Sequence, residues 1–320
     1  MIKIENLCKS YKRRKLNANI KNCFGIFSKN EDIPAVKNIT LSIERGERVA
    51  LCGANGAGKS TLIKMMIGLI EPTRGNITIN GNKPFKRNKL YLRQIGVVLG
   101  QKQQLIPDLT PKDTFELHKR IYKLSDKDYK NQLNTLVDLL NVRKVLDTQV
   151  RLLSLGERIK CELIVSLLHR PNIIFLDEPT IGLDYKSQIA IRNFINKYTG
   201  ENEATLLLIS HCWDDINSTC NRLLYMNNGE VVVDKKINDL FKDIKELRKL
   251  KISTASNVLD DVRVRNLCKN IRLEQEQIVC IVEEKYIGKL LSIVASSSII
   301  REHVVESLNI FDVMELRGNI

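Results

Sequence analysis

Three glycines, a lysine and a serine between residues 53 and 60 have the clearest chemical meaning. Gly53, Gly58, Lys59 and Ser60 fit the spacing G-x-x-x-x-G-K-S. Glycines let the backbone wrap closely around a pyrophosphate, with successive N–H groups pointing at its oxygens. A lysine here reaches the terminal phosphates, and a serine hydroxyl can ligate Mg²⁺. The spacing predicts a site for a nucleoside triphosphate and Mg²⁺. The other loop residues expected around the phosphates are Asn55, Gly56 and Thr61.

Two adjacent carboxylates, Asp177 and Glu178, follow the apolar run IIFL. We expect Asp177 to hold the Mg²⁺ shell and Glu178 to polarise a water in line with the γ-phosphate. Neighbours on a strand face opposite sides, so the pattern predicts that the two side chains point apart. The alternative interpretation is a solvated acidic end of a strand.

Strands and helices that alternate along the chain must position these residues. Apolar runs predict buried strands within residues 44–53, 172–180 and 204–210, and the segments 59–70 and 187–198 are typical of helices. Such alternation favours an α/β fold with a parallel sheet. From about 88 to 169 helical spacing dominates, which predicts an α-rich subdomain.

Two segments stand apart from this pattern. Lys12 to Pro34 is basic and lacks clear periodicity, so we expect an inserted loop that carries Lys12–Lys15 ahead of Phe24 and Phe27. After Asp234 the composition changes. The stretch 237–251 has the charge and spacing of an amphipathic helix, and residues 237–320 are expected to form a small α+β accessory domain.

Composition narrows the cellular setting. The chain has 320 residues with a formal net charge of +14, which favours an anionic partner such as nucleic acid, nucleotide or a membrane surface. Its eight cysteines lack C-x-x-C pairs and are expected to be reduced thiols. The charged opening residues and the absence of about 18 consecutive apolar residues predict neither a signal peptide nor a spanning helix. We therefore expect a cytosolic chain.

Five motifs in order resemble those of the ATP-binding subunits of ABC (ATP-binding cassette) transporters, over about Met1 to Asp234. GANGAGKST resembles the Walker A motif of that family, and IIFLDEPTIGLD its Walker B motif and D-loop. LSLGE at 153–157 resembles the signature, GVVLGQ the Q-loop and LLLISH the switch histidine. The resemblance implies a P-loop NTPase cassette, a RecA-like mixed or parallel sheet core with a helical subdomain, joined here to the α+β extension.

The resemblance also implies a mechanism in which two cassettes pack head to tail around ATP. Ser154 and Gly156 of one copy would donate to the γ-phosphate held by the other, at a helix N-terminus. Glu178 would be the catalytic base and His211 would orient water and phosphate. The remaining implied roles are Gln101 for sensing Mg²⁺ and coupling to a membrane partner, Asp184 for contact between cassettes, and Tyr11 for stacking on adenine.

The signature departs from the common L-S-G-G-Q pattern. Leu155 replaces its first glycine and Glu157 its glutamine. Leu155 adds bulk beside the phosphate and Glu157 adds a negative charge. Both changes would lower the affinity for ATP or the turnover at the composite site. The resemblance implies that signatures of the form L-S-x-G-E occur in exporter cassettes, so we interpret the change as the mark of a subfamily.

Three function classes share such an ATPase. A translation-type factor normally carries two cassettes, and a nucleic-acid ATPase a long coiled coil or a zinc hook; this sequence predicts one cassette with neither feature. The favoured hypothesis is the energy-coupling subunit of an ABC-2-type exporter, peripheral on the cytoplasmic face of the membrane and bound to separate permease subunits. A soluble ABC ATPase acting on nucleic acid or the ribosome is the alternative. The basic insert suits anionic lipid headgroups or simply a solvated loop.

Overall fold

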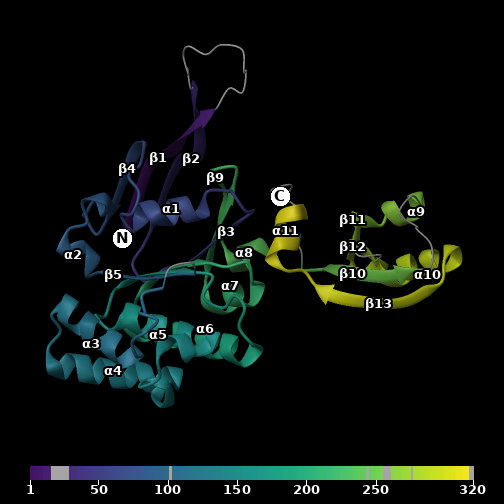
Figure 1. Ribbon diagram of the computed structural model, residues 1–320. Coiled ribbons are helices and arrows are strands. Elements are labelled where there is room, and N and C mark those ends of the chain that lie inside the picture. The colour runs from purple at the N-terminus through teal and green to yellow at the C-terminus, as the bar shows by residue number, and fades with distance from the viewer. Residues whose placement is uncertain (16–28, 101–102, 243–244, 255–260, 275–276, 317–320) are drawn as a thin grey trace, which may run out of the picture. The chain divides into compact units, whose positions relative to one another are not determined.

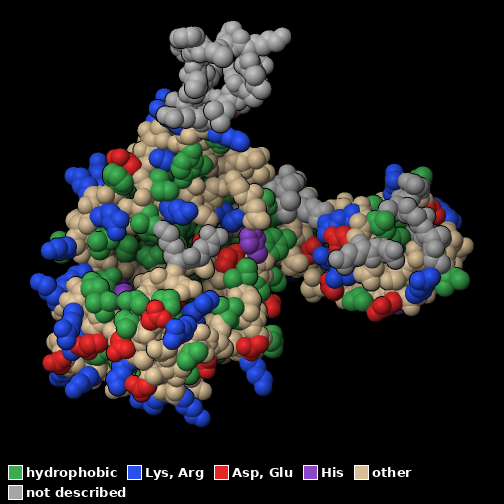
Figure 2. Space-filling view, viewed as in Figure 1, with side chains coloured by type: hydrophobic (Ala, Val, Ile, Leu, Met, Phe, Trp, Pro, Cys, Tyr) green, Lys and Arg blue, Asp and Glu red, His purple; other side chains and the backbone are tan. Residues whose placement is uncertain are grey.

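The chain forms two compact units, Met1–Lys235 and Lys236–Ile320. The computed structural model describes residues 1–15, 29–100, 103–242, 245–254, 261–274 and 277–316 (Figure 1). Among these residues, no helix combines the length and the apolar character needed to cross a bilayer. On the face of the first unit in Figure 2, lysine and arginine side chains are spread out and interspersed with acidic ones. The net positive charge is therefore not gathered into one stripe on this face.

A six-stranded sheet with the order β5-β6-β7-β3-β8-β9 lies at the centre of the first unit. Its strands are β3 (Arg48–Gly53), β5 (Ile95–Leu99), β6 (Ile173–Asp177), β7 (Thr205–Ile209), β8 (Arg222–Asn227) and β9 (Glu230–Lys236). The pairs from β5 through β8 are parallel. Parallel strands covered on both faces are apolar throughout, and β7 is buried at all five of its residues. The predicted α/β class with a parallel sheet is confirmed.

A smaller antiparallel sheet contains β1 (Ile2–Lys15), β2 (Lys29–Ile43) and β4 (Arg74–Ile79), in the order β2-β1-β4. The predicted loop from Lys12 to Pro34 is wrong at both ends, because β1 continues to Lys15 and β2 begins at Lys29. Residues 16–28 lie outside the described residues. Lys12 pairs across the ladder with Asp32 and Arg13 with Glu31. Cross-strand pairs of opposite charge favour this pairing even though the sequence lacks an apolar period.

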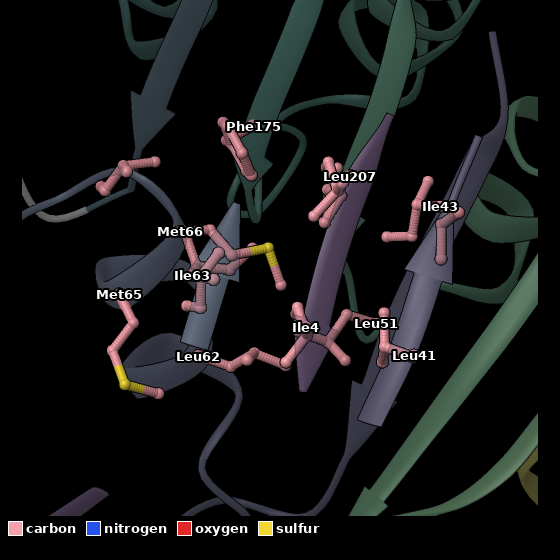
Figure 3. Packing of buried hydrophobic residues seen from close by; sticks show 14 of the residues in the cluster. Ile4, Leu41, Ile43, Leu51, Leu62, Ile63, Met65, Met66, Phe175 and Leu207 are labelled. Atoms are coloured by element: carbon pink, nitrogen blue, oxygen red, sulfur yellow. The ribbon is translucent and has the colours of Figure 1, made fainter. Parts of the chain in front are cut away.

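The helix α1 (Lys59–Met66) packs against both sheets and forms the core of the first unit (Figure 3). Leu62, Ile63, Met65 and Met66 are its buried apolar residues. They share a cluster with Ile4, Leu41 and Ile43 of the antiparallel sheet and with Leu51, Phe175 and Leu207 of the parallel sheet. Because this core fixes α1, it also fixes the loop that precedes the helix.

The remaining helices of the first unit are α2 (Lys89–Leu92), α3 (Pro111–Tyr122), α4 (Asp126–Leu140), α5 (Leu155–Leu167), α6 (Tyr185–Asn202) and α7 (Trp213–Thr219). Short 3₁₀ turns cover Pro84–Lys86, Arg143–Val145 and Val150–Leu152. The stretch 88–169 is not helical throughout, because its residues 95–99 form β5 and join the parallel sheet. Capping side chains set the starts of the longer helices: Thr110 accepts from Asp113 N–H, and Ser125 accepts from Asp128 N–H.

The second unit contains an antiparallel sheet with the order β11-β12-β10-β13. Its elements are α8 (Ile237–Leu240), β10 (Leu247–Thr254), α9 (Val262–Arg265), β11 (Cys268–Glu274), β12 (Gln277–Glu283), a 3₁₀ turn (Glu284–Tyr286), α10 (Ile287–Ser297), β13 (Ile300–Ser307) and α11 (Ile310–Leu316). Leu290 and Val294 of α10 cover one face of this sheet. The helix predicted over 237–251 is wrong, because it ends at Leu240 and β10 begins at Leu247.

Candidate nucleotide site

A cavity of about 590 Å³ opens where the parallel strands β3, β5, β6 and β7 end. Ligands of open parallel sheets bind at this edge, outside the carboxyl ends of the strands. The lining residues are Ala35, Asn55, Gly56, Ala57, Gly58, Lys59, Ser60, Thr61, Ile63, Lys64, Leu99, Gly100, Asp177, Glu178, Ile181, Ile209 and His211. The cavity therefore brings together most of the residues expected around phosphate.

The loop between β3 and α1 requires its glycines for a steric reason. Gly58 has a φ of +98°, in the left-handed region that side chains disfavour. A Cβ atom on Gly58 would lie 2.3 Å from the carbonyl oxygen of Ala35. A Cβ atom on Gly53 would lie 2.1 Å from the carbonyl oxygen of Met226. Only glycine fits at either position, so the loop packs closely on its neighbours before α1 begins.

The ammonium group of Lys59 lies inside this loop. Its Nζ atom donates hydrogen bonds to the carbonyl oxygens of Gly53, at 2.7 Å, and Ala54, at 2.9 Å. The side chain is buried, and burial lowers the pKa of Lys59, while the charges of Glu178 and Asp177 act in the opposite direction. The two carbonyl bonds hold the cation beside the cavity and pre-organise it for an anion.

Asp177 and Glu178 lie in the same cavity, although strand alternation predicts that they point apart. Alternation fails because β6 ends at Asp177 and Glu178 has a left-handed φ of +52°. Burial raises the pKa of both carboxyl groups, and the charge of Lys59 lowers both. Among the described residues, the Oε1 atom of Glu178 is buried without a hydrogen-bond partner. That oxygen is free to accept a hydrogen bond from a small molecule in the cavity.

His211 follows β7 and contacts Glu178 through both its backbone and its ring. The backbone N–H of His211 donates to Oε2 of Glu178 at 3.3 Å. The Nε2 atom lies 3.6 Å from Oε1 of the same carboxyl group. Burial lowers the pKa of His211, and the charge of Lys59 lowers it further. The imidazole therefore stays neutral down to a lower pH than the ring of an ordinary histidine does.

The signature residues and Asp184 lie outside the cavity of their own chain. Ser154 caps α5: its hydroxyl accepts from Glu157 N–H, and Glu157 Oε2 accepts from the Ser154 hydroxyl at 2.7 Å and from the Ser154 N–H at 2.9 Å. These bonds lower the pKa of Glu157. Gly156 is buried, and a Cβ atom there would lie 2.9 Å from Ser187 Oγ. Asp184 caps α6 and accepts from Ser187 N–H and from Ser187 Oγ.

Gln101 and Tyr11 complete the set of expected residues. Gln101 lies outside the described residues. Tyr11, in β1, is 40% exposed, and its hydroxyl lies 3.4 Å from Thr61 Oγ1, but it does not line the cavity. Sequence reasoning missed Lys64 and Ile181. Lys64 follows Ser60 by four residues, so helical spacing alone places both on one face of α1.

Comparison with known proteins identifies the family. The family model described as ABC transporter matches residues 36–181. The ABC transporter ATP-binding protein NatA of Bacillus subtilis is 32% identical, over 67% of this chain and 87% of its own length. The chain belongs to the ABC transporter ATP-binding proteins. Another member of this family, the Nod factor export ATP-binding protein I of Azorhizobium caulinodans, is 31% identical over 71% of each protein.

Solved ABC cassettes have the same fold. The dimeric structure of a post-hydrolysis state of the ATP-binding cassette MJ0796, bound to ADP and Pi, matches with a TM-score of 0.62 and 28% identity, over 74% of this chain and 99% of that one. The ABC family and the P-loop cassette fold expected from the motifs are thus confirmed. This chain is an ATP-binding, ATP-hydrolysing subunit of a membrane transporter.

Proposed function

We propose that this subunit drives an ABC-2-type exporter, and that two copies close head to tail on ATP. The observation that carries the proposal is the division of the site. Lys59, Asp177, Glu178 and His211 line one cavity, whereas Ser154, at an exposed helix N-terminus, lies outside it. A site that lacks its signature residues within one chain is completed when a second chain supplies them.

The loop before α1 binds the phosphates. The N–H groups at the start of α1 and the Lys59 ammonium face the cavity, and both favour an anion. The β- and γ-phosphates take up the Lys59 donors that now bond to Gly53 and Ala54. Ser60 and Asp177 line the same cavity with hard oxygen ligands, which suit Mg²⁺.

Magnesium fits a site of this composition. The described residues contain no group of three or more His, Cys, Asp or Glu side chains arranged around a metal. Mg²⁺ is commonly held by one or two protein ligands, with phosphate oxygens and water completing its shell. Ser60, Asp177 and Gln101 would hold the ion, which when bound neutralises phosphate charge. The substrate is therefore the Mg²⁺ complex of ATP.

Glu178 is the general base in this proposal. Its unpartnered Oε1 accepts the proton of a water that attacks the γ-phosphate. Because burial raises the pKa of Glu178, the carboxylate is a better proton acceptor than an exposed glutamate. His211, neutral beside it, orients that water and the phosphate. Lys59 stabilises the charge of the reacting phosphoryl group.

The second copy contributes the start of α5. Ser154 and Gly156 donate to the γ-phosphate, and the α5 dipole adds its positive end. Glu157 must release the Ser154 hydroxyl first, because the Glu157 carboxylate accepts a hydrogen bond from that hydroxyl. Asp184 lies at the start of α6 on the same surface loop as Gly182 and contacts the opposite cassette. Tyr11, half-exposed near Thr61, stacks on the adenine ring.

Separate permease subunits are the membrane partners. Leu117 and Ile121 lie one turn apart on α3, and both are exposed, as is Leu109 before that helix. Apolar side chains that gather on a surface in this way favour contact with another protein. Gln101, a short distance earlier in the chain, couples this contact to the nucleotide. The subunit therefore works as a peripheral protein on the cytoplasmic face of the membrane.

Export as the direction of transport rests on the L-S-x-G-E form of the signature. One relative named for export, the Nod factor protein, supports this direction. An energy-coupling factor protein EcfA2 of Clostridium perfringens is also 32% identical, over 68% of this chain and 78% of its own length. Anionic lipid binding by the β1–β2 region is opposed by charge pairing within the hairpin. Lys12 and Arg13 pair with Asp32 and Glu31, so their charges are offset within the hairpin.

Purification from detergent extracts of the native cells tests this function. We expect the tagged chain to bring down a polytopic membrane protein in an amount close to its own, and nuclease treatment to leave the complex intact. A Leu117→Ser and Ile121→Ser chain should lose the partner, whereas an exposed polar change on another helix, Glu201→Gln, should keep it. Recovery of ribosomes or nucleic acid in place of a membrane protein would contradict the transporter function.

A further inference from the structure

A buried ion pair lies next to the cavity, between α6 and α7. The Nε atom of Arg192 donates to Oδ1 of Asp215 at 2.6 Å. The two side chains are only 8% and 2% exposed. Burying a charge costs free energy unless the charge is paired and hydrogen-bonded. Removing one partner of a buried ion pair leaves the other charge buried and uncompensated. A pair this deeply buried therefore constrains every group that bonds to it.

The second oxygen of Asp215 joins the two strand ends that carry the proposed catalytic residues. Oδ2 accepts from the hydroxyl of Thr180 and, at 2.9 Å, from the hydroxyl of Ser210. Both hydroxyl groups belong to buried residues. Thr180 lies two residues after Glu178, and Ser210 lies one residue before His211. One carboxylate oxygen thus links both segments.

The guanidinium group of Arg192 extends the same network to the loop before α6. Its Nη2 atom donates to Gln188 Oε1 at 3.2 Å, and the amide of Gln188 donates to the carbonyl oxygen of Leu183 at 3.1 Å. Leu183 directly precedes Asp184. Three segments that line or flank the cavity therefore depend on one ion pair.

We propose that Asp215, held by Arg192, is a positioning residue for ATP hydrolysis that fixes the spacing between Glu178 and His211. The inference depends on the proposed function, in which these two residues act on the attacking water. Asp215 itself does not line the cavity and touches no phosphate. Its effect is on the orientation of the base, so its loss lowers kcat and leaves ATP binding through Lys59 and the glycine loop intact.

Asp215→Asn tests this role, because it keeps the shape of the side chain and removes its charge. We expect kcat to fall about 10-fold to 100-fold, with KM for ATP within about twofold of the wild type. Asp214→Asn is the matched control: Asp214 is the adjacent acid, is 66% exposed and lies 3.8 Å from the same guanidinium group. That control should keep the wild-type kcat.

Thr180→Val gives the decisive result if Asp215→Asn does not fold, because it removes one hydroxyl and leaves the ion pair intact. It should lower kcat without changing KM, whereas Thr180→Ser, which keeps the hydroxyl, should not. Unchanged kcat in Thr180→Val, or a rise in KM alone, would overturn the inference. Glu178→Gln distinguishes failure of the proposed function from failure of the positioning role. Wild-type turnover in Glu178→Gln would contradict the proposed function. Loss of turnover in Glu178→Gln together with wild-type turnover in Thr180→Val would contradict the positioning role alone.

Discussion

The Nε2 atom of His211 lies 3.6 Å from the Oε1 atom of Glu178, and the two residues follow adjacent parallel strands of the central sheet. Glu178 directly follows β6, and His211 lies two residues beyond the end of β7. Burial raises the pKa of the carboxyl group and lowers that of the imidazole. The pair therefore sets a proton acceptor beside a neutral ring at the place where the γ-phosphate is proposed to lie.

Replacing Glu178 by Gln should stop hydrolysis while preserving ATP binding. A general base contributes about 100-fold to 10,000-fold, so phosphate release should fall by at least about 100-fold. The ATP-bound dimer should accumulate, which light scattering after gel filtration would detect. Glu201→Gln, an exposed change on α6, is the control and should behave as wild type. Phosphate release from Glu178→Gln at the wild-type rate would rule out Glu178 as the base.

The same substitution should stabilise the nucleotide-free chain at neutral pH. A carboxyl whose pKa is raised by folding binds more protons in the folded than in the unfolded chain, so its contribution to stability falls as the pH rises from its ordinary range through the raised value. Gln at position 178 does not titrate. Thermal unfolding should therefore give a higher Tm for Glu178→Gln at pH 7.5, and the difference should vanish below about pH 4.

A Tm difference that is absent at neutral pH, or that grows as the pH falls, would contradict the burial of the Glu178 charge. Glu201→Gln is again the control, because the side chain of Glu201 is 57% exposed on α6. Its Tm should follow that of the wild type across the whole pH range.

Two glycines of the phosphate loop should differ in their response to alanine. Gly58 and Gly56 both have positive φ, at +98° and +83°, so alanine costs about 1–2 kcal/mol at either position. A Cβ atom at Gly58 meets the Ala35 carbonyl oxygen at 2.3 Å, whereas one at Gly56 meets nothing within 4 Å. Gly58→Ala should therefore lower the free energy of unfolding by more than Gly56→Ala. Denaturant titration measures both, and equal losses would contradict the close approach.

Neutralising Glu157 should strengthen the ATP-dependent dimer. The carboxylate accepts both donors of Ser154 at the start of α5, where the proposed γ-phosphate of the second copy must bind. Gln keeps an oxygen for the cap and removes the charge. Two like charges about 4 Å apart repel by about 1 kcal/mol in water and about 4 kcal/mol at an effective dielectric of about 20, so the repulsion relieved lies between these limits. Dimerisation of Glu157→Gln in the Glu178→Gln background should occur at lower ATP concentration. Weaker dimerisation would show that the charge of Glu157 aids closure.

The motifs predicted the cavity better than they predicted the elements around it. The residues from Asn55 to Thr61, with Asp177 and His211, are recognisable in sequence because phosphate chemistry demands fixed residue types at fixed spacings. The shared cavity of Asp177 and Glu178 was not predictable from strand alternation, because it depends on the left-handed φ of Glu178. The Asp215 network was also missed, because the motifs assign no role to Asp215 or Arg192 and the ion pair joins two residues that are 23 positions apart.

The two wrong elements have separate causes. Lys12 and Arg13 lie in a strand because of partners about 20 residues away, and such pairing leaves no local period in the sequence. In the second unit, Ile237, Leu240 and Leu247 mimic helical spacing. Leu250 and Ile252 are buried at alternate positions of β10, and that shorter period of two decides the structure.

The most direct test of the central claim is a crystal structure of the Glu178→Gln chain with ATP and Mg²⁺. Two copies sharing each nucleotide are expected, with Lys59 of one copy on the β- and γ-phosphates and the hydroxyl of Ser154 from the other within hydrogen-bond distance of the γ-phosphate. A structure in which ATP fills the cavity of a single copy, while Ser154 stays bonded to its own Glu157 and solvent covers the γ-phosphate, would contradict the account.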